Sequence, residues 1–179
     1  PDHPGFGKSD QPEWITSVPD LACFYLCALE DLGIARLRVL GLSLGGWLAA
    51  EMAVMCPHLF ERLILVGAAG VKPTQGEITD IFLLSPAELT AKLFHDPKQA
   101  PEYEQLYGSP PTPEEQDLLT RNHEMAARIT WKPYMHDPRL PSLLRRLQLP
   151  TLIVWGRQDA IMPVHCAEIY HQNIRDSQL

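Results

Sequence analysis

Apolar and polar positions follow two regular patterns in the outer parts of the chain. Three short runs rich in Leu, Ile and Val are typical of buried strands and lie at residues 36–42, 62–67 and 150–156. Three longer segments repeat apolar residues at helical spacing, at residues 18–32, 44–56 and 163–174. Short buried strands that alternate with helices are typical of a parallel sheet covered by helices. The pattern therefore predicts an α/β fold with a mostly parallel sheet, and we expect the helix over 18–32 to pack on that sheet.

The pattern changes between Val71 and Leu149. Eleven prolines fall between Pro73 and Pro150, and no apolar run there is typical of a strand. Ser85 and Thr112 each precede a proline and lie three residues before a glutamate, which is the signature of a capped helix start. We therefore predict a first core segment over residues 1–70, a helical insertion over 71–149 and a second core segment over 150–179.

A glycine-rich turn connects the first predicted strand to the helix that follows it. Gly41, Ser43 and Gly45 form a G-x-S-x-G pattern at this turn. A serine on a sharp strand-to-helix turn needs neighbours without side chains, so that the helix can pack against the strand while the hydroxyl stays accessible. Ser43 is therefore the candidate nucleophile. The backbone N–H of Leu44, at the start of the helix, is the candidate oxyanion donor.

This turn, between these two elements, resembles the nucleophile elbow of the alpha/beta-hydrolase superfamily. The opening stretch Asp2-His-Pro-Gly-Phe-Gly-Lys-Ser9 is similar to the family's D-x-P-G-x-G-x-S loop, and Trp155-Gly-x-x-Asp159 is similar to the element that carries the triad acid. The resemblance implies a partial alpha/beta-hydrolase fold in which the helical insertion is a lid over the nucleophile. It also implies that the first strands and the second oxyanion donor precede residue 1.

A serine nucleophile needs a base, and in this fold the base follows the acid along the chain. The predicted helix over 163–174 occupies most of the residues after Asp159. A strand and a connecting loop do not fit into the remainder, so we expect the last strand and the catalytic histidine to lie beyond residue 179. His165 is a less favoured candidate, because a residue at a helix start usually points away from such a site. His3 lies in the opening loop, where contact with substrate is conceivable but a base role is not expected.

Composition excludes several classes of partner. The chain has 179 residues, 45% of them hydrophobic, and a formal net charge of −7, which suits one globular domain. The basic residues are scattered apart from Arg145-Arg146, so the sequence shows no basic cluster of the kind that binds nucleic acids. No apolar run approaches the roughly 20 residues of a membrane span, and no leader pattern opens the chain. We expect a cytoplasmic protein with no membrane partner, and the oligomeric state stays open.

Neither a metal nor a cofactor is expected. The four cysteines show no C-x-x-C pair and no histidine at metal-ligand spacing, so we predict free thiols at Cys23, Cys27, Cys56 and Cys166. His95-Asp96 and His136-Asp137 each precede a proline, and helix ends explain such pairs better than metal binding does.

The resemblance implies a serine hydrolase that cleaves a carboxylic ester or related acyl bond of a small molecule. Ser43 attacks the carbonyl, the Leu44 N–H stabilises the oxyanion, and Asp159 orients a histidine located outside residues 1–179. In the lid, the candidate substrate-binding residues are Phe82, Trp131 and Tyr134. Without the base and the second oxyanion donor, residues 1–179 alone are expected to be inactive and to fold poorly.

Three alternatives stay open. Carbon–carbon bond hydrolysis of ring-cleavage products uses the same triad, and the lid and the Trp155-Gly156 strand end resemble those enzymes. Proline iminopeptidase activity is a less favoured alternative, since the sequence shows no obvious acidic cluster that would bind the amino group of a peptide substrate. A non-catalytic small-molecule receptor on the same fold would have a non-basic residue at the histidine position, which distinguishes it from both kinds of enzyme.

Overall fold

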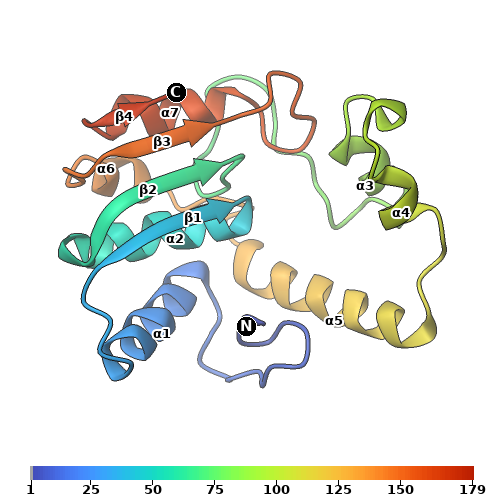
Figure 1. Ribbon diagram of the computed structural model, residues 1–179, viewed down its shortest axis with the longest axis horizontal. Coiled ribbons are helices and arrows are strands. Elements are labelled where there is room, and N and C mark those ends of the chain that lie inside the picture. Colours follow the sequence, from blue (N-terminus) through green and yellow to red (C-terminus); the bar gives the residue numbers. More distant parts are fainter. Residues whose placement is uncertain (1) are drawn as a thin grey trace.

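The computed structural model describes residues 2–179, without the side chain of Leu106. A four-stranded sheet forms its centre, with the order β1-β2-β3-β4 and every neighbouring pair parallel (Figure 1). The strands are β1 Leu37–Leu42, β2 Phe60–Val66, β3 Thr151–Val154 and β4 Ser177–Gln178. Because all four run in one direction, their carboxyl ends lie along a single edge of the sheet. The predicted α/β fold with a parallel sheet is confirmed.

Helices cover one face of this sheet. α2 (Leu44–Met55) packs on β1 and β2, and α7 (His165–Asn173) packs on β3. α1 (Val18–Asp31) packs mainly on α2, so the expectation that it lies on the sheet was wrong. Only three residues at the start of α1 are fully buried, and apolar residues of its later turns, such as Phe24 and Leu29, are partly buried against the core. α1 therefore lies beside α2, beyond the β1 edge of the sheet (Figure 1).

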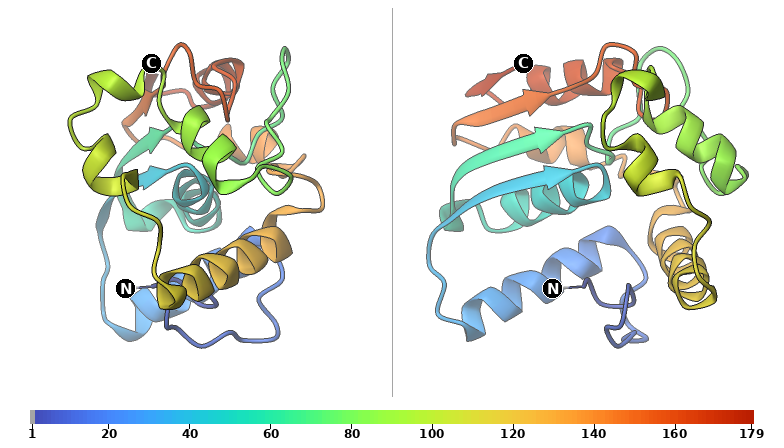
Figure 2. Two further views of the ribbon diagram at one scale, coloured as in Figure 1. Left: turned by 90° about the vertical axis from the view of Figure 1, so that its right-hand side faces the viewer. Right: turned by 45° about the vertical axis from the view of Figure 1, so that its right-hand side comes forward.

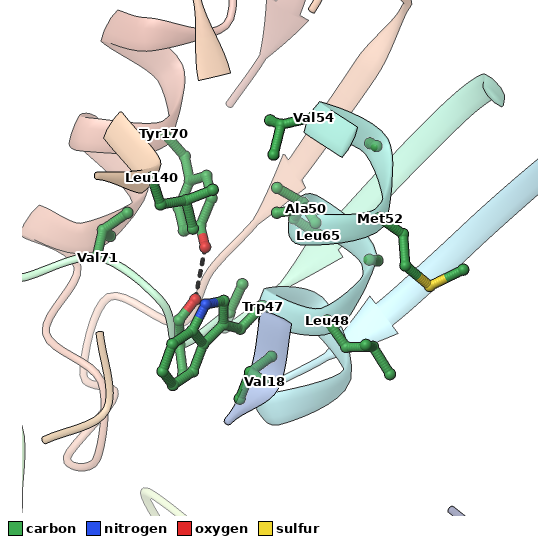
Figure 3. Close-up of a cluster of buried hydrophobic side chains, with 14 of the residues drawn as sticks. Val18, Trp47, Leu48, Ala50, Met52, Val54, Leu65, Val71, Leu140 and Tyr170 are labelled. Carbon is green, nitrogen blue, oxygen red and sulfur yellow. Dashed lines mark hydrogen bonds between the residues drawn. The ribbon is translucent and has the colours of Figure 1, made fainter. Parts of the chain in front are cut away.

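The α2 helix lies close to the sheet because its packing positions are small. Ala49, Ala50 and Ala53 are at most 2% exposed, and larger residues fill the space around them (Figure 3). A helix with small residues facing a sheet can approach it without leaving voids, which keeps the packing density of a protein interior. Pro57 then begins the short 3-10 helix η1 (Pro57–Leu59), which leads into β2. This packing fixes the start of α2, where the elbow lies.

Helices of 3 to 18 residues fill the segment between β2 and β3. They are α3 Pro86–Leu93, η2 Pro97–Gln99, α4 Tyr103–Tyr107, α5 Pro113–Thr130 and α6 Leu140–Leu144. Both predicted capping boxes are present, at Ser85 with Glu88 and at Thr112 with Glu115. α3 and α4 lie beyond the carboxyl ends of the strands, and α6 returns behind the sheet (Figures 1 and 2). The insertion is therefore helical, as the cap signals indicated.

The other face of the sheet is open within residues 2–179. Leu40 and Leu42 on β1 are each 64% exposed, and Leu152 and Val154 on β3 are 42% and 43% exposed. These residues alternate along each strand with buried ones, as expected when only one face is covered. The expectation that the strand after α7 (His165–Asn173) lies wholly beyond residue 179 was wrong, because Ser177–Gln178 already pair with β3.

Candidate active site

Ser43 lies in a strained turn at the carboxyl end of β1. Its φ is 53° and its ψ is −118°, and positive φ is uncommon for a residue with a side chain. Such a conformation costs about 1–3 kcal/mol and persists only where the surroundings enforce it. Here the Ser43 N–H donates to the Val66 carbonyl at 2.9 Å, which ties the turn to the end of β2. The side chain is exposed, and its hydroxyl has no hydrogen-bond partner within residues 2–179.

The predicted oxyanion donor is available at the same turn. Ser43 is the N-cap of α2 and Leu44 is the first residue of the helix. The N–H groups of the first helical turn have no acceptor inside the helix, and they form the positive end of the helix dipole. The Leu44 N–H can therefore donate to an oxygen held beside Ser43.

Two glycines, Gly41 and Gly46, are sterically required at the elbow. A Cβ on Gly41 would lie 2.3 Å from the Gly45 carbonyl oxygen, and a Cβ on Gly46 would lie 2.5 Å from the Ala68 Cβ. Gly45 differs, since a Cβ built there meets no atom within 4 Å. The prediction that the glycines flanking Ser43 allow close packing therefore holds for Gly41 but not for Gly45. The close contact falls on Gly46 instead, because that residue faces Ala68, two residues after the end of β2.

Asp159 lies in the loop after β3, at the same edge of the sheet as Ser43. Its Oδ1 accepts the backbone N–H groups of Ile161 and Met162, each at 2.9 Å. Its Oδ2 lies 3.5 Å from the position of a Cβ built on Gly67, the residue after β2, and has no hydrogen-bond donor within residues 2–179. One oxygen therefore orders the loop, and the other is free to hold a base. The alternative role of capping the next helix is not observed, since α7 has Val164 as its N-cap.

None of the hydrogen bonds in residues 2–179 joins a histidine to Ser43 or Asp159. His165 is the first residue of α7, as predicted, and it makes no hydrogen bond to Asp159. His3 bonds through Nδ1 to the Tyr25 hydroxyl at 2.6 Å, and burial lowers its pKa. The described residues thus hold the candidate nucleophile and the candidate acid, and no histidine among them is hydrogen-bonded to either.

The three predicted substrate-binding residues lie together in the helical insertion. The Phe82 ring centre lies 5.9 Å from that of Trp131 and 6.0 Å from that of Tyr134, and His123 packs edge-on against the same ring at 4.9 Å. The Tyr134 hydroxyl is occupied, because it donates to the Thr79 carbonyl at 2.8 Å and accepts the Ile81 N–H at 2.9 Å. Tyr134 therefore holds this aromatic cluster in place, whereas the Trp131 side chain remains 52% exposed.

A cavity of about 320 Å³ lies between the end of α5 and the first turn of α2. Trp47 forms one wall, and Ile129 and Lys132 from the α5 end form another. Neither Ser43 nor the three aromatic residues of the insertion line it. The cavity therefore shows that the end of α5 lies next to the first turn of α2, and it is separate from the elbow.

A buried acid on α2 was not predicted from the sequence. Glu51 is 1% exposed and accepts the Trp47 Nε1–H at 2.9 Å. Its pKa is raised to about 7, chiefly by burial and in part by the nearby Asp137, while the Trp47 hydrogen bond and Arg139 oppose the rise. Asp137 is itself 6% exposed and paired with Arg139 at 2.6 Å. A single acid within the apolar run from Trp47 to Met55 was the available sequence signal.

Replacing Glu51 with glutamine is expected to stabilise the protein at alkaline pH. The folded-state pKa of about 7 exceeds the unfolded value of 4.5, so the folded protein binds more protons and loses stability as pH rises between these values. Above pH 8 the cost reaches about 3 kcal/mol, and Glu51→Gln removes it. Thermal melts at pH 5 and pH 8 should show a higher Tm for the variant at pH 8 only. Glu30→Gln, at an exposed position, is the control, and equal shifts for both variants would contradict the account.

The other reactive groups show no second site. Burial raises the pKa of the Cys166 thiol to about 12, with the Asp159 charge as a further cause, so this thiol stays protonated. The four cysteines are free as predicted, although Cys23 and Cys27 are exposed. Within residues 2–179, no three His, Cys, Asp or Glu residues are grouped so as to hold a metal ion. None of the helices there combines the length and apolar character needed to cross a membrane.

Comparison with known proteins places this geometry in a family. The sequence matches the alpha/beta hydrolase fold family over residues 1–179. It is 30% identical to an uncharacterised protein of Mycobacterium tuberculosis, a match that covers 100% of this chain and 58% of that protein. It is also 30% identical to a 2-hydroxy-6-oxononadienedioate/2-hydroxy-6-oxononatrienedioate hydrolase of Burkholderia vietnamiensis, over 91% of this chain and 60% of that protein. The chain thus spans less than two thirds of the length of these relatives.

Solved structures agree with the family match. An esterase from Exiguobacterium antarcticum superposes with a TM-score of 0.65 at 26% identity, over 99% of this chain and 69% of that one. A meta-cleavage product hydrolase superposes with a TM-score of 0.75 at 21% identity, over 100% of this chain and 68% of that one, a likeness of fold. The parallel sheet, the elbow at Ser43 and the family match over the whole sequence lead to one conclusion: this chain belongs to the alpha/beta hydrolase fold family.

Proposed function

We propose that residues 1–179 carry the nucleophile, one oxyanion donor and the acid of a serine hydrolase that cleaves a carboxylic ester or related acyl bond. The observation that carries this proposal is Ser43 itself, held at a φ of 53° with an exposed hydroxyl that has no hydrogen-bond partner among residues 2–179. Asp159 supports it, because its free Oδ2 lies at the same sheet edge, beside the residue that follows β2. A surface serine in a relaxed turn would need neither the strain nor the acid.

Each group has a defined step in this proposal. The Ser43 hydroxyl oxygen bonds to the acyl carbon as its proton moves to a histidine, and the Leu44 N–H donates to the carbonyl oxygen as that oxygen becomes negative. The same proton then passes to the departing alcohol oxygen, which leaves an acyl group on Ser43. Water adds to this acyl carbon with the histidine as base, and collapse releases the acid and returns the proton to Ser43. Asp159 stabilises the imidazolium in both halves of the cycle.

The base and the second oxyanion donor are proposed to come from parts of the whole protein outside residues 1–179. The absence of any histidine bonded to Ser43 or Asp159 within residues 2–179 supports this view, as does the greater length of the relatives. Residues 1–179 alone should therefore show no triad-dependent turnover, and experiments on activity require the whole protein.

The helical insertion is proposed to act as a lid that shapes the acyl pocket. α3 and α4 lie beyond the carboxyl ends of the strands, which is the edge that carries Ser43 (Figure 2). Trp131 and Phe82 are the proposed contact residues, because Trp131 is half exposed and packs on Phe82, while Tyr134 is committed to the backbone. A flat aromatic surface of this kind favours planar or unsaturated acyl groups.

Replacing Trp131 with alanine should raise KM for aryl or dienoyl substrates by about tenfold, because stacking and apolar burial of this size contribute about 1–1.5 kcal/mol. The kcat should change little, since Trp131 does not touch the reacting atoms in this proposal. Steady-state kinetics with a benzoyl and an acetyl ester measure the effect, which should be confined to the benzoyl ester. Trp14→Ala is a matched control, because Trp14 is 55% exposed and its ring centre lies 6.4 Å from that of Phe24, a residue of α1. Equal changes with both esters would rule out a stacking role for Trp131.

Hydrolysis of a carbon–carbon bond in a ring-cleavage product is the second candidate. Two relatives, at 28% and 30% identity, carry the name of a 2-hydroxy-6-oxononadienedioate/2-hydroxy-6-oxononatrienedioate hydrolase. The same three groups serve both reactions, so their geometry does not favour either. We expect a direct comparison of kcat/KM for a p-nitrophenyl ester and for a 2-hydroxy-6-oxo-dienoate to separate them. Binding of either compound without turnover by the whole protein would support a receptor on the same fold and contradict both hydrolase proposals.

A further inference from the structure

Four residues that follow β2, Gly67 to Gly70, contact both proposed catalytic groups. The Ala69 N–H donates to the Ser43 carbonyl oxygen at 3.1 Å. Ala68 lies against Gly46 in the first turn of α2, so closely that a Cβ on Gly46 would be 2.5 Å from the Ala68 Cβ. At the other end, Gly67 lies beside the Asp159 carboxylate. This segment therefore connects the Ser43 elbow to the Asp159 loop.

Tyr170 anchors the segment from behind. This residue lies on α7, is 0% exposed, and donates its hydroxyl to the Ala69 carbonyl oxygen at 2.5 Å (Figure 3). The Ala69 residue is thus held on both sides, by Tyr170 through its carbonyl and by Ser43 through its N–H. Burial raises the pKa of Tyr170 well above its usual value, so the hydroxyl stays protonated and remains a donor.

Gly70 makes this contact possible. Its φ is +106°, and a Cβ there would lie 2.6 Å from the Trp47 Cδ1 and 2.8 Å from the Tyr170 hydroxyl oxygen. Any side chain at position 70 would displace the hydroxyl or the indole. The arrangement therefore depends on a residue without a side chain at the crossing point of α2, α7 and the segment after β2.

We propose that Tyr170 is a positioning residue, which holds the Ser43 elbow and the Asp159 loop in register through the Gly67–Gly70 segment. This inference rests on the proposed hydrolase function. Tyr170 is fully buried, so it acts through the Ala69 backbone and not on substrate. A strained elbow depends on its surroundings for its conformation, and a misplacement of about 1 Å can lower a rate by about a hundredfold.

Tyr170→Phe in the whole protein tests this inference, because it removes the hydroxyl and keeps the ring. We expect kcat to fall by about tenfold to a hundredfold while KM stays within about twofold, since geometry at the nucleophile changes and substrate contacts do not. Thr151→Val is the matched control. It removes a buried hydroxyl that donates to the Leu149 carbonyl at 3.1 Å, at the amino end of β3 and so at the far edge of the sheet. Both variants are assayed well below their Tm, and the control should keep its kcat.

A second variant keeps the test decisive if Tyr170→Phe does not fold. In this variant lactic acid replaces Ala69, so an ester oxygen stands where the N–H that donates to the Ser43 carbonyl was. The carbonyl at position 69 is kept as the acceptor for Tyr170. We expect kcat to fall by a similar factor. A kcat within twofold of wild type in Tyr170→Phe, or in the ester variant where the phenylalanine variant is unfolded, would overturn the inference. The proposed function fails separately, if wild-type Ser43 does not react with a fluorophosphonate.

Discussion

Replacing Ser43 with alanine is expected to lower kcat of the whole protein by about a millionfold, the scale seen when a triad nucleophile is removed. The reason is that the acyl carbon then has no protein oxygen to bond with, and the Leu44 N–H alone stabilises only a slow attack by water. Binding should survive, because the Ser43 hydroxyl is exposed and bonds to nothing within residues 2–179. Steady-state hydrolysis of a short p-nitrophenyl ester measures the loss, and calorimetric titration with the acid product measures binding.

Stability separates this result from simple unfolding. Alanine has the same backbone restriction as serine at a φ of 53°. The free energy of unfolding of Ser43→Ala should therefore lie within about 0.5 kcal/mol of the wild-type value. Ser142→Ala, on the exposed face of α6, is the control for losing a serine hydroxyl. Retention of more than a tenth of the activity in Ser43→Ala would mean that the elbow does not supply the nucleophile.

Replacing Asp159 with asparagine should lower kcat by about 10³- to 10⁴-fold, as the loss of a triad acid does elsewhere. The amide oxygen of asparagine can still accept the Ile161 and Met162 N–H groups, so the loop should keep its shape. Its NH2 group would occupy the place of Oδ2. An NH2 group can neither accept a hydrogen bond from a histidine N–H nor stabilise the positive charge of an imidazolium. The change therefore removes the electrostatic role and leaves the structural role intact.

A second aspartate with the same structural role gives a matched control for Asp159→Asn. Asp96 accepts the Lys98 N–H at 3.1 Å at the start of η2, in the helical insertion, so Asp96→Asn tests the loss of a loop-ordering carboxylate. Its kcat should be unchanged. A normal kcat in Asp159→Asn would identify Asp159 as a loop-ordering residue only and leave the nucleophile without an acid.

Elements with a local cause were predictable from the sequence. The capping boxes at Ser85 and Thr112 placed two helix starts correctly, because the cap residues lie within four positions of one another. Buried runs of Leu, Ile and Val located β1, β2 and β3 to within two residues. The position of α1 on α2 was not predictable, since helical spacing shows which face is apolar but not which neighbour covers it.

The same division applies to the site. Ser43 and Asp159 stand in short motifs that carry their own backbone context, and both lie at the carboxyl edge of the sheet. Glu51 and Tyr170 were missed because their roles depend on contacts between distant segments, such as the bond from Tyr170 to Ala69. The importance of Gly46 over Gly45 could not be predicted from the motif either, because it follows from which of the two residues faces Ala68, after the end of β2.

Reaction of the folded whole protein with a fluorophosphonate, followed by mass spectrometry of its peptides, tests the central claim most directly. The account predicts one phosphonyl group per molecule, on the peptide that contains Ser43, and no adduct in Ser43→Ala. Modification of another residue, or no adduct on protein that melts cooperatively, would contradict the claim that the elbow of this chain carries an activated nucleophile.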